Sequence, residues 1–158
     1  MRELRLMKNE RVRFYFLYTL IFCIFSLLLY SPFLITGKAF IWEPDGSTQH
    51  FNAFVYLGTW GREILRNLIF EHQLVIPMWE FGIVYGADVF NTLQYYVLGD
   101  PIALFSIITP SSYAELMYCL LIVFRLYLAG IAFCAFCRKM GCGRVASLCG
   151  AFSYAFCC

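Results

Sequence analysis

The stretch Phe14–Ile35, FYFLYTLIFCIFSLLLYSPFLI, runs for 22 residues without a charged side chain. As an α-helix it is about 33 Å long, enough to cross the roughly 30 Å hydrocarbon core of a bilayer. A cleaved signal peptide also begins with basic residues, but its apolar segment is shorter and ends at a small-residue cleavage site. The residues that follow, Thr36-Gly37-Lys38, do not resemble such a site. We therefore expect a retained transmembrane helix over residues 14–36.

The composition of the whole chain points to the same environment. Of the 158 residues, 61% are apolar, 20% are aromatic and 14% are charged. Soluble domains average about 45–50% apolar and about 25% charged residues. A globule of this size leaves much of its surface in water, so it cannot bury such an excess of apolar side chains. Disorder is excluded as well, because disordered chains are poor in aromatic residues and rich in charge. The composition indicates an integral membrane protein.

A second apolar run, Tyr113–Cys137, predicts a second span, and Arg138, Lys139 and Arg144 follow it. Five of the 12 basic residues precede the first span, namely Arg2, Arg5, Lys8, Arg11 and Arg13. Cytoplasmic segments carry the excess of Lys and Arg. The N-terminus (1–13) and the loop 138–144 are therefore expected in the cytoplasm, and residues 37–112 outside it. Residues 145–158 begin a third apolar helix too short to cross. We expect an amino-terminal fragment of an all-α, polytopic membrane protein.

The basic residues flank apolar runs instead of forming a phosphate-reaching face, so no nucleic-acid partner is predicted. The eight cysteines do not form a disulfide framework, and none lies in residues 37–112, where oxidation is possible. Cys134-x-x-Cys137 lacks the second ligand pair that a zinc site requires. No metal ligands and no cofactor are predicted, although a divalent metal remains open.

The long loop 37–112 contains one strong helical pattern. Apolar residues recur at three- and four-residue spacing from about residue 48 to 70, and Ser47 or Thr48 can cap this helix. Such an amphipathic helix lies either in the membrane interface or against other helices, and the pattern does not choose between the two. Asp100-Pro101 begins a shorter apolar stretch, which predicts a re-entrant or interfacial helix over about 101–109.

Asp45 is the first candidate for chemistry, because it follows the first span closely and has polar neighbours. An aspartate carboxylate is ionised at neutral pH and can accept a proton from a substrate hydroxyl. Pro44-Asp45-Gly46 is also a turn sequence, so a purely structural role stays open. His50 can act as a ligand, as a second base or as an interfacial side chain.

Four other residues are candidates for substrate binding. Asp88 and Asp100 lie in the same loop as Asp45, where each can equally serve as a turn or cap residue. Tyr95 and Tyr96 can stack on a sugar ring or anchor the chain in the interface.

Arg125 is a further candidate, near the middle of the second span. A cation at that depth costs at least ~2.5 kcal/mol on insertion scales unless it is paired or solvated. It forms either a structural ion pair or an anion site, for instance for a lipid phosphate.

Several short motifs together resemble the bacterial YfhO membrane protein family. They follow one another along nearly the whole chain: Gly37-Lys38-Ala39-Phe40-Ile41-Trp42, Asp45-Gly46, Gln49-His50-Phe51, Phe81-Gly82, Gly86-Ala87-Asp88, Tyr95-Tyr96, Gly99-Asp100-Pro101 and Arg125-Leu126-Tyr127-Leu128-Ala129-Gly130. Members of that family are several times longer, with a dozen or so spans. Glu43 departs from the family pattern, which usually has uncharged residues just before the aspartate.

The resemblance implies a GT-C-like helical bundle in the bacterial cytoplasmic membrane. It implies a glycosyltransferase that takes sugar from a polyprenyl-phosphate donor and transfers it, with inversion, to a cell-surface glycopolymer such as lipoteichoic acid. Asp45 occupies the place of the acidic residue that such enzymes carry just past their first span, so the resemblance implies that it is catalytic. The fragment alone is expected to be inactive.

The alternative function is a non-catalytic membrane protein, such as a lipid-linked sugar flippase, a transporter or an assembly subunit. Transporters usually place charged residues and broken helices at mid-bilayer. This chain places most of its acidic residues in the outer loop, which favours surface chemistry.

Overall fold

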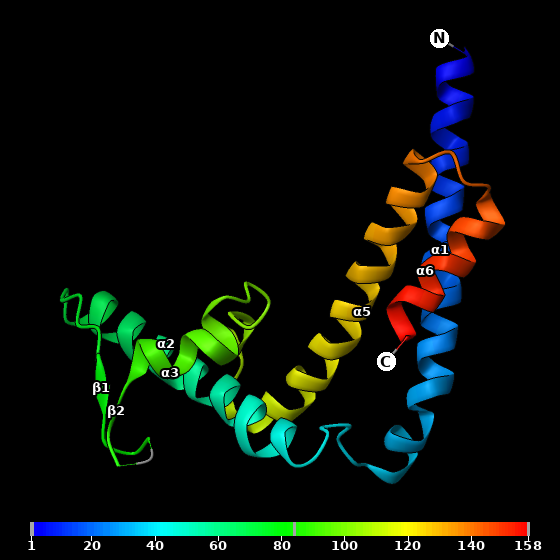
Figure 1. Cartoon of the computed structure of the whole chain (residues 1–158). Helices are drawn as coiled ribbons and strands as arrows, with labels where there is room; N and C mark the ends of the chain where they lie inside the picture. Colours follow the sequence, from blue (N-terminus) through cyan, green and yellow to red (C-terminus); the bar gives the residue numbers. More distant parts are fainter. Residues whose placement is uncertain (1, 84, 158) are drawn as a thin grey trace. The chain divides into compact units, whose positions relative to one another are not determined.

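The apolar stretch that begins at Phe14 lies within one long helix, α1 (Arg2–Thr36), in the computed structural model (Figure 1). The structure describes residues 2–83 and 85–157, and their side chains from residue 10 onward, so the side chains of Arg2, Arg5 and Lys8 lie outside it. The helix starts upstream of the predicted residue 14. It ends where Gly37 takes a φ of +63° and the Lys38 amide donates to the Phe33 carbonyl at 3.1 Å. This Schellman-type end suits glycine, because other residues rarely adopt a left-handed backbone.

The second apolar run forms α5 (Ala114–Lys139), which follows a 3₁₀ turn, η3 (Ser111–Tyr113). Glu115 in its first turn and Arg138 and Lys139 in its last turn complement the helix dipole. The segments Glu10–Thr36 and Ser111–Lys139 are both long and apolar enough to cross a membrane. On α1, Ile35 is 83% exposed and Phe16 is 69% exposed. Large apolar side chains exposed along a whole helix require lipid or further protein around them.

The chain divides into two units, of which the first comprises residues 1–38 and 122–158. In it α6 (Arg144–Phe156) packs along α1, as Figure 1 shows. Tyr18 is fully buried in the core of this unit, and its hydroxyl donates to the Tyr127 carbonyl at 3.1 Å. Gly130 contacts the Tyr18 hydroxyl so closely that a Cβ atom at position 130 would collide with it. The Tyr18 ring also packs against the rings of Tyr127 on α5 and Phe152 on α6, so this one tyrosine contacts both helices.

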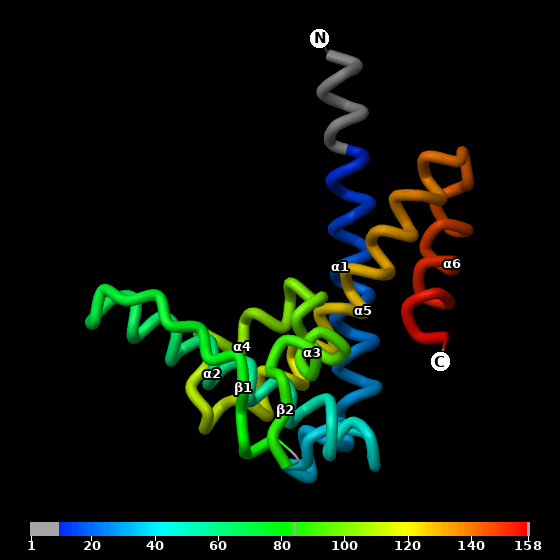
Figure 2. Tube along the Cα trace, turned by 60° about the vertical axis from the view of Figure 1, so that its left-hand side comes forward, coloured from blue at the N-terminus to red at the C-terminus, as the bar shows by residue number. Residues whose placement is uncertain are grey.

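The second unit, residues 39–121, holds the loop between the two candidate spans (Figure 2). Its elements are the π-helical turn η1 (Gly46–His50), α2 (Phe51–Phe70), strands β1 (Trp79–Glu80) and β2 (Ala87–Asp88), α3 (Val89–Leu93), the π-helical turn η2 (Gln94–Leu98) and α4 (Phe105–Ile108). Its core contains Phe54, Leu57, Val89 and Leu93, each at most 1% exposed. The unit is a folded part of the protein with its own buried core.

Helix α2 contacts α4 through two glycines and one arginine. A Cβ atom at Gly58 would lie 2.6 Å from the Ser106 carbonyl oxygen, and one at Gly61 would lie 2.7 Å from the Ile107 side chain. The Arg62 guanidinium donates to the carbonyls of Ser106 at 2.9 Å and of Thr109 at 2.6 Å. The Ser106 carbonyl also accepts from the Thr109 amide at 3.3 Å, and Thr109 is the C-cap of α4, where carbonyls lack partners further along the helix. Arg62 therefore fastens α4 to α2.

Several local expectations for this loop differ from the structure. Ser47 and Thr48 do not cap the helix: both hydroxyls donate to the Pro44 carbonyl, and the chain is already helical at Gly46. Strands β1 and β2 pair antiparallel in a segment for which no strand was predicted. Residues 101–104 form turns, so α4 is four residues long, while the predicted helix covered about 101–109.

The predicted apolar face of the loop helix is correct near its start and wrong near its end. Phe54, Leu57 and Trp60 are buried, as the three- and four-residue spacing predicts. Leu65 and Leu68 are exposed instead, and Asn67 is buried. The Asn67 carbonyl accepts from the amides of Glu71 and Gln73, so the chain folds back over this end of α2. The spacing of apolar residues does not show where the chain folds back, so it could not predict which face of this end of α2 is buried.

Candidate functional site

Asp45 lies directly before η1, nine residues after the last residue of α1, and its side chain is exposed. It occupies the N-cap position of η1, yet its carboxylate makes no capping hydrogen bond. Oδ1 accepts instead from the side-chain amide Nε2 of Gln49 at 3.1 Å. Within the described part of the chain, Oδ2 has no hydrogen-bond partner. Asp45 thus presents an oriented carboxylate with one oxygen available to another group.

Gln49 connects Asp45 to a residue far along the chain. Its Oε1 accepts from the Tyr96 hydroxyl at 3.0 Å, across 47 positions of sequence. A carboxylate can only accept, so the amide must turn its NH₂ group to Asp45 and its oxygen to Tyr96. The three side chains form one chain of hydrogen bonds in which Tyr96 and Gln49 hold the Asp45 carboxylate.

Aromatic rings surround this chain of hydrogen bonds. The His50 ring lies 5.4 Å from the Tyr96 ring, edge to face, and 5.9 Å from the Trp42 ring. Tyr95 packs edge to face on Tyr96 at 4.8 Å. Edge-to-face pairs at these distances are favourable. We call Trp42, Asp45, Gln49, His50 and Tyr96 the Asp45 cluster.

Both π-helical turns of the second unit contribute to the Asp45 cluster. In η1 the Ser47 amide donates to the Trp42 carbonyl five residues earlier, at 3.1 Å. The wider turn sets Gly46 against the Trp42 ring, where a Cβ atom would lie 2.6 Å from Cδ1. The second turn, η2, carries Tyr95 and Tyr96 and contacts η1. Single π-helical turns recur at functional sites, because they re-aim side chains that a regular helix would point elsewhere.

Asp88 and Asp100 have local structural contacts. Oδ1 of Asp88 accepts from the Asn91 amide at 2.7 Å, so Asp88 caps the N-terminus of α3. Oδ1 of Asp100 accepts from the Ile102 amide at 2.9 Å and begins the turns that lead to α4. These bonds agree with the cap and turn interpretation, and neither aspartate belongs to the Asp45 cluster.

Arg125 lies on α5 in the first unit, within the second candidate span, and is partly buried there. Among the described residues, no three His, Cys, Asp or Glu side chains come together in a way that could hold a metal ion. An open groove of about 310 Å³ lies along α2 and is lined by Thr59, Arg62, Glu63 and Arg66. The Arg62 guanidinium is already bonded to backbone carbonyls, so we interpret this groove as part of the packing between α2 and α4 and not as a ligand site.

Sequence reasoning named Asp45, His50, Tyr95 and Tyr96 as candidates, and the structure brings them together with Gln49 and Trp42, whose contacts the sequence did not predict. The signal for Gln49 was present, because side chains four positions apart in a helix are neighbours. Trp42 was named only as the last residue of a family motif. Its contact with His50 depends on the chain reversing between residues 42 and 46, which no periodic pattern predicts.

Comparison with known proteins identifies one family. The family model described as "Bacterial membrane protein YfhO" matches residues 15–158. The match covers residues 15–36 of the first candidate span, the whole second candidate span and the whole second unit. No curated protein and no solved structure matches the chain.

Proposed function

Because the chain belongs to the YfhO family of bacterial membrane proteins, we propose that it takes part in glycosyl transfer at the outer face of the cytoplasmic membrane. The donor is a sugar on a polyprenyl phosphate, and the acceptor is a hydroxyl of a cell-surface polymer such as lipoteichoic acid. In this proposal the N-terminus is cytoplasmic, residues 39–121 lie outside, and the chain is part of a polytopic GT-C-type enzyme.

One observation carries the proposal: the exposed Asp45 carboxylate is held by Gln49 and Tyr96, and Asp45 follows the last residue of a candidate span by nine positions in the sequence. A general base must be ionised, accessible and held in one orientation. Asp45 meets the last two conditions through its exposure and its hydrogen bond to Gln49. Lipid-linked sugars present their reacting carbon near the membrane surface, which is where a residue just beyond a span lies.

The reaction that this site supports is an inverting displacement. Oδ2 of Asp45 accepts the proton of the acceptor hydroxyl while the hydroxyl oxygen attacks the anomeric carbon. The bond between that carbon and the phosphate oxygen breaks, and its electron pair leaves with the polyprenyl phosphate. Cationic groups stabilise the charge that develops on the phosphate.

Exposed aromatic rings near Asp45 suit a sugar ligand. Tyr95 is 78% exposed and packs on the Tyr96 ring. Trp42 is 54% exposed and packs on the His50 ring. A pyranose offers an apolar face for stacking and hydroxyls at its rim, so aromatic faces beside a carboxylate and an imidazole match its chemistry. In the proposal Tyr95 and His50 contact the sugar, and Asp88 and Asp100 shape the surrounding backbone.

The experiment that tests the function measures sugar transfer in isolated bacterial membranes. Membranes that contain the native protein should move labelled sugar from polyprenyl phosphate onto the polymer, and membranes from a deletion strain should not. A flippase or assembly subunit would change where the lipid-linked sugar accumulates and would form no glycosidic bond. Equal transfer in both membranes would refute the proposal.

Replacing Gln49 with leucine should lower the rate of transfer about tenfold. The substitution removes the donor to Asp45 and the acceptor for Tyr96, and a hydrogen bond to a charged group contributes about 1.5–3 kcal/mol. Because Gln49 acts through Asp45, kcat should fall while KM for the donor changes little.

Gln49→Glu separates positioning from a merely structural role. Two neighbouring carboxylates resist being ionised together, so the acidic limb of the pH–rate profile should move to higher pH in this variant. A variant protein with an unchanged pH profile and an unchanged rate would show that Gln49 does not position Asp45.

A further inference from the structure

The first unit contains a cavity of about 480 Å³ that the proposed glycosyl transfer does not use. It lies between residues 10–15 of α1 and the end of α5, and the N-terminal residue of α6 also lines it. Phe14 and Tyr15 form part of its wall. The remaining wall is charged and comes from three helices.

Four cations line this cavity against one carboxylate. Arg11 comes from α1, Arg138 and Lys139 come from α5, and Arg144 comes from α6. Glu10 is the one acidic residue of the described lining, so the cavity has an excess of three positive charges. Cations from separate helices repel one another when no anion lies between them. The arrangement therefore favours an anionic ligand.

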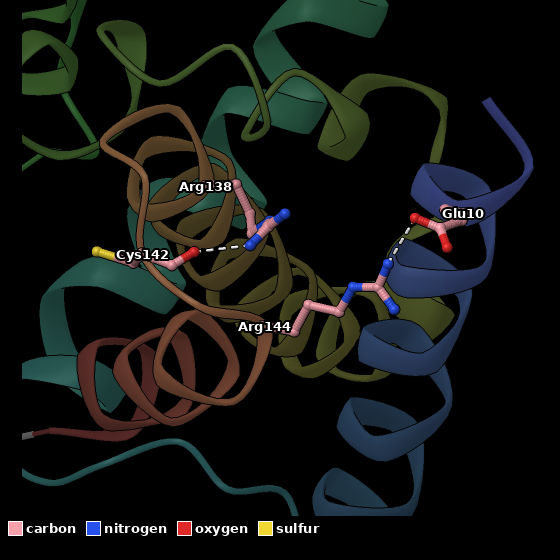
Figure 3. Close-up of polar contacts among 4 residues, drawn as sticks. All are labelled: Glu10, Arg138, Cys142 and Arg144. Carbon is pink, nitrogen blue, oxygen red and sulfur yellow. Dashed lines mark hydrogen bonds and ion pairs between the residues drawn. The ribbon is translucent and has the colours of Figure 1, made fainter. Parts of the chain in front are cut away.

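Two of the cations are held in place by the protein, as Figure 3 shows. Nη2 of Arg144 reaches α1 and donates to Oε2 of Glu10 at 2.7 Å. Nη1 of Arg138 donates to the Cys142 carbonyl at 2.6 Å, and its guanidinium lies 5.5 Å from the centre of the Phe14 ring. Arg11 and Lys139, by contrast, have no ion-pair partner within the described residues. The site combines two fixed cations with two that remain available to a ligand.

The cavity also lies at the depth of a membrane surface. The uncharged run of α1 begins at Phe14 and that of α5 ends at Cys137, and the charged residues that line the cavity lie just beyond these two ends. Phosphate groups of lipids lie at this level, and basic pockets between transmembrane helices bind anionic headgroups. Phe14 and Tyr15 face the same space and suit the less polar part of a lipid.

We propose that this basic cavity binds a phosphate group, carried by the headgroup of an anionic phospholipid or by free phosphate. The depth of the site favours the phospholipid. The proposal is independent of Asp45 and of sugar transfer, so either can fail without the other.

The test uses the whole protein purified in detergent with equal amounts of phosphatidylglycerol and phosphatidylcholine. Native mass spectrometry should show retained phosphatidylglycerol in clear preference to phosphatidylcholine. The double variant Arg11→Gln/Lys139→Gln removes the two available cations and should lower phosphatidylglycerol binding about thirtyfold. Glu10→Gln removes the carboxylate that occupies Arg144 and should raise it about fivefold.

A matched control separates the cavity from general surface charge. Arg13 and Lys38 are exposed cations that do not line the cavity, and Arg13→Gln/Lys38→Gln removes the same total charge. This variant should retain phosphatidylglycerol as the native protein does. An equal loss in both double variants, or no preference between the two lipids, would overturn the proposal.

A competition arm distinguishes the two sources of phosphate. If millimolar inorganic phosphate displaces phosphatidylglycerol, the phosphate group alone suffices and the soluble anion is a ligand. If phosphatidylglycerol stays bound, the ligand is the lipid. Both results support a phosphate site, whereas failure of both ligands to bind the native protein removes it.

Discussion

Asp45→Asn should abolish sugar transfer while leaving the protein inserted in the membrane. Asparagine has nearly the shape of aspartate, and its Oδ1 can still accept from Gln49 Nε2, so the Asp45 cluster keeps its geometry. It cannot take a proton from a hydroxyl. Loss of a general base lowers a rate by about 100- to 10,000-fold. Transfer of labelled sugar in isolated membranes, at equal protein content, measures this loss.

Two further variants complete the experiment on Asp45. Glu71→Gln makes the same exchange of carboxylate for amide at an exposed residue after α2 in the same unit, and it should leave transfer unchanged. Asp45→Glu keeps a base but moves it by about one bond length, so a reduced, measurable rate is expected. Normal transfer by Asp45→Asn would remove Asp45 from the mechanism.

Arg62→Met should destabilise the second unit by about 3 kcal/mol. The guanidinium donates to the carbonyls of Ser106 and Thr109, two residues that are 3% and 4% exposed. The Thr109 carbonyl loses the donor that Arg62 gives it, which costs about 1–3 kcal/mol, and the Ser106 carbonyl keeps only the 3.3 Å bond from the Thr109 amide, because methionine fills the space without donating. Thermal unfolding in detergent and faster amide hydrogen exchange over residues 103–109 measure the effect.

Arg66→Met is the matched control for Arg62→Met. Arg66 is exposed one turn further along α2 and lines the same groove, so its removal makes the same change of charge. Exposed substitutions of this kind change stability by about 0.5 kcal/mol or less. Arg62→Lys should fall between the two, because one ammonium group cannot replace a planar fork of donors. If Arg62→Met and Arg66→Met proved equally stable, Arg62 would not fasten α4 to α2.

The helices of the chain followed closely from local pattern, and the loop between the candidate spans did not. Length and hydropathy predicted α1 and α5, since both depend on residues adjacent in the chain. In residues 39–121 the short helix α3 and the two strands escaped prediction, and α4 is shorter than the helix predicted over about 101–109, because tertiary contacts stabilise segments of two to five residues.

The candidate site was predicted in its members and missed in its connections. Asp45, His50 and Tyr96 were named for their chemistry, and they lie together in the structure. Asp88 was named with them but caps α3. Asp45 contacts the Gln49 side chain and Asp88 contacts the Asn91 amide, and only the folded structure shows which partner each carboxylate has.

The amino-acid sequence by itself determined that this protein belongs in a membrane, that it has two candidate spans, and which family it resembles. Hydropathy, helix length and ordered motifs are all read along the chain, so they need no fold. Only the tertiary structure decided that Gln49 links Asp45 to Tyr96, that Arg62 bonds to carbonyls more than forty residues away, and that four cations from three helices line one cavity. Each of these contacts joins residues that are far apart in the sequence. Chain reversals and the burial of apolar side chains bring such residues together, and local conformational preference does not.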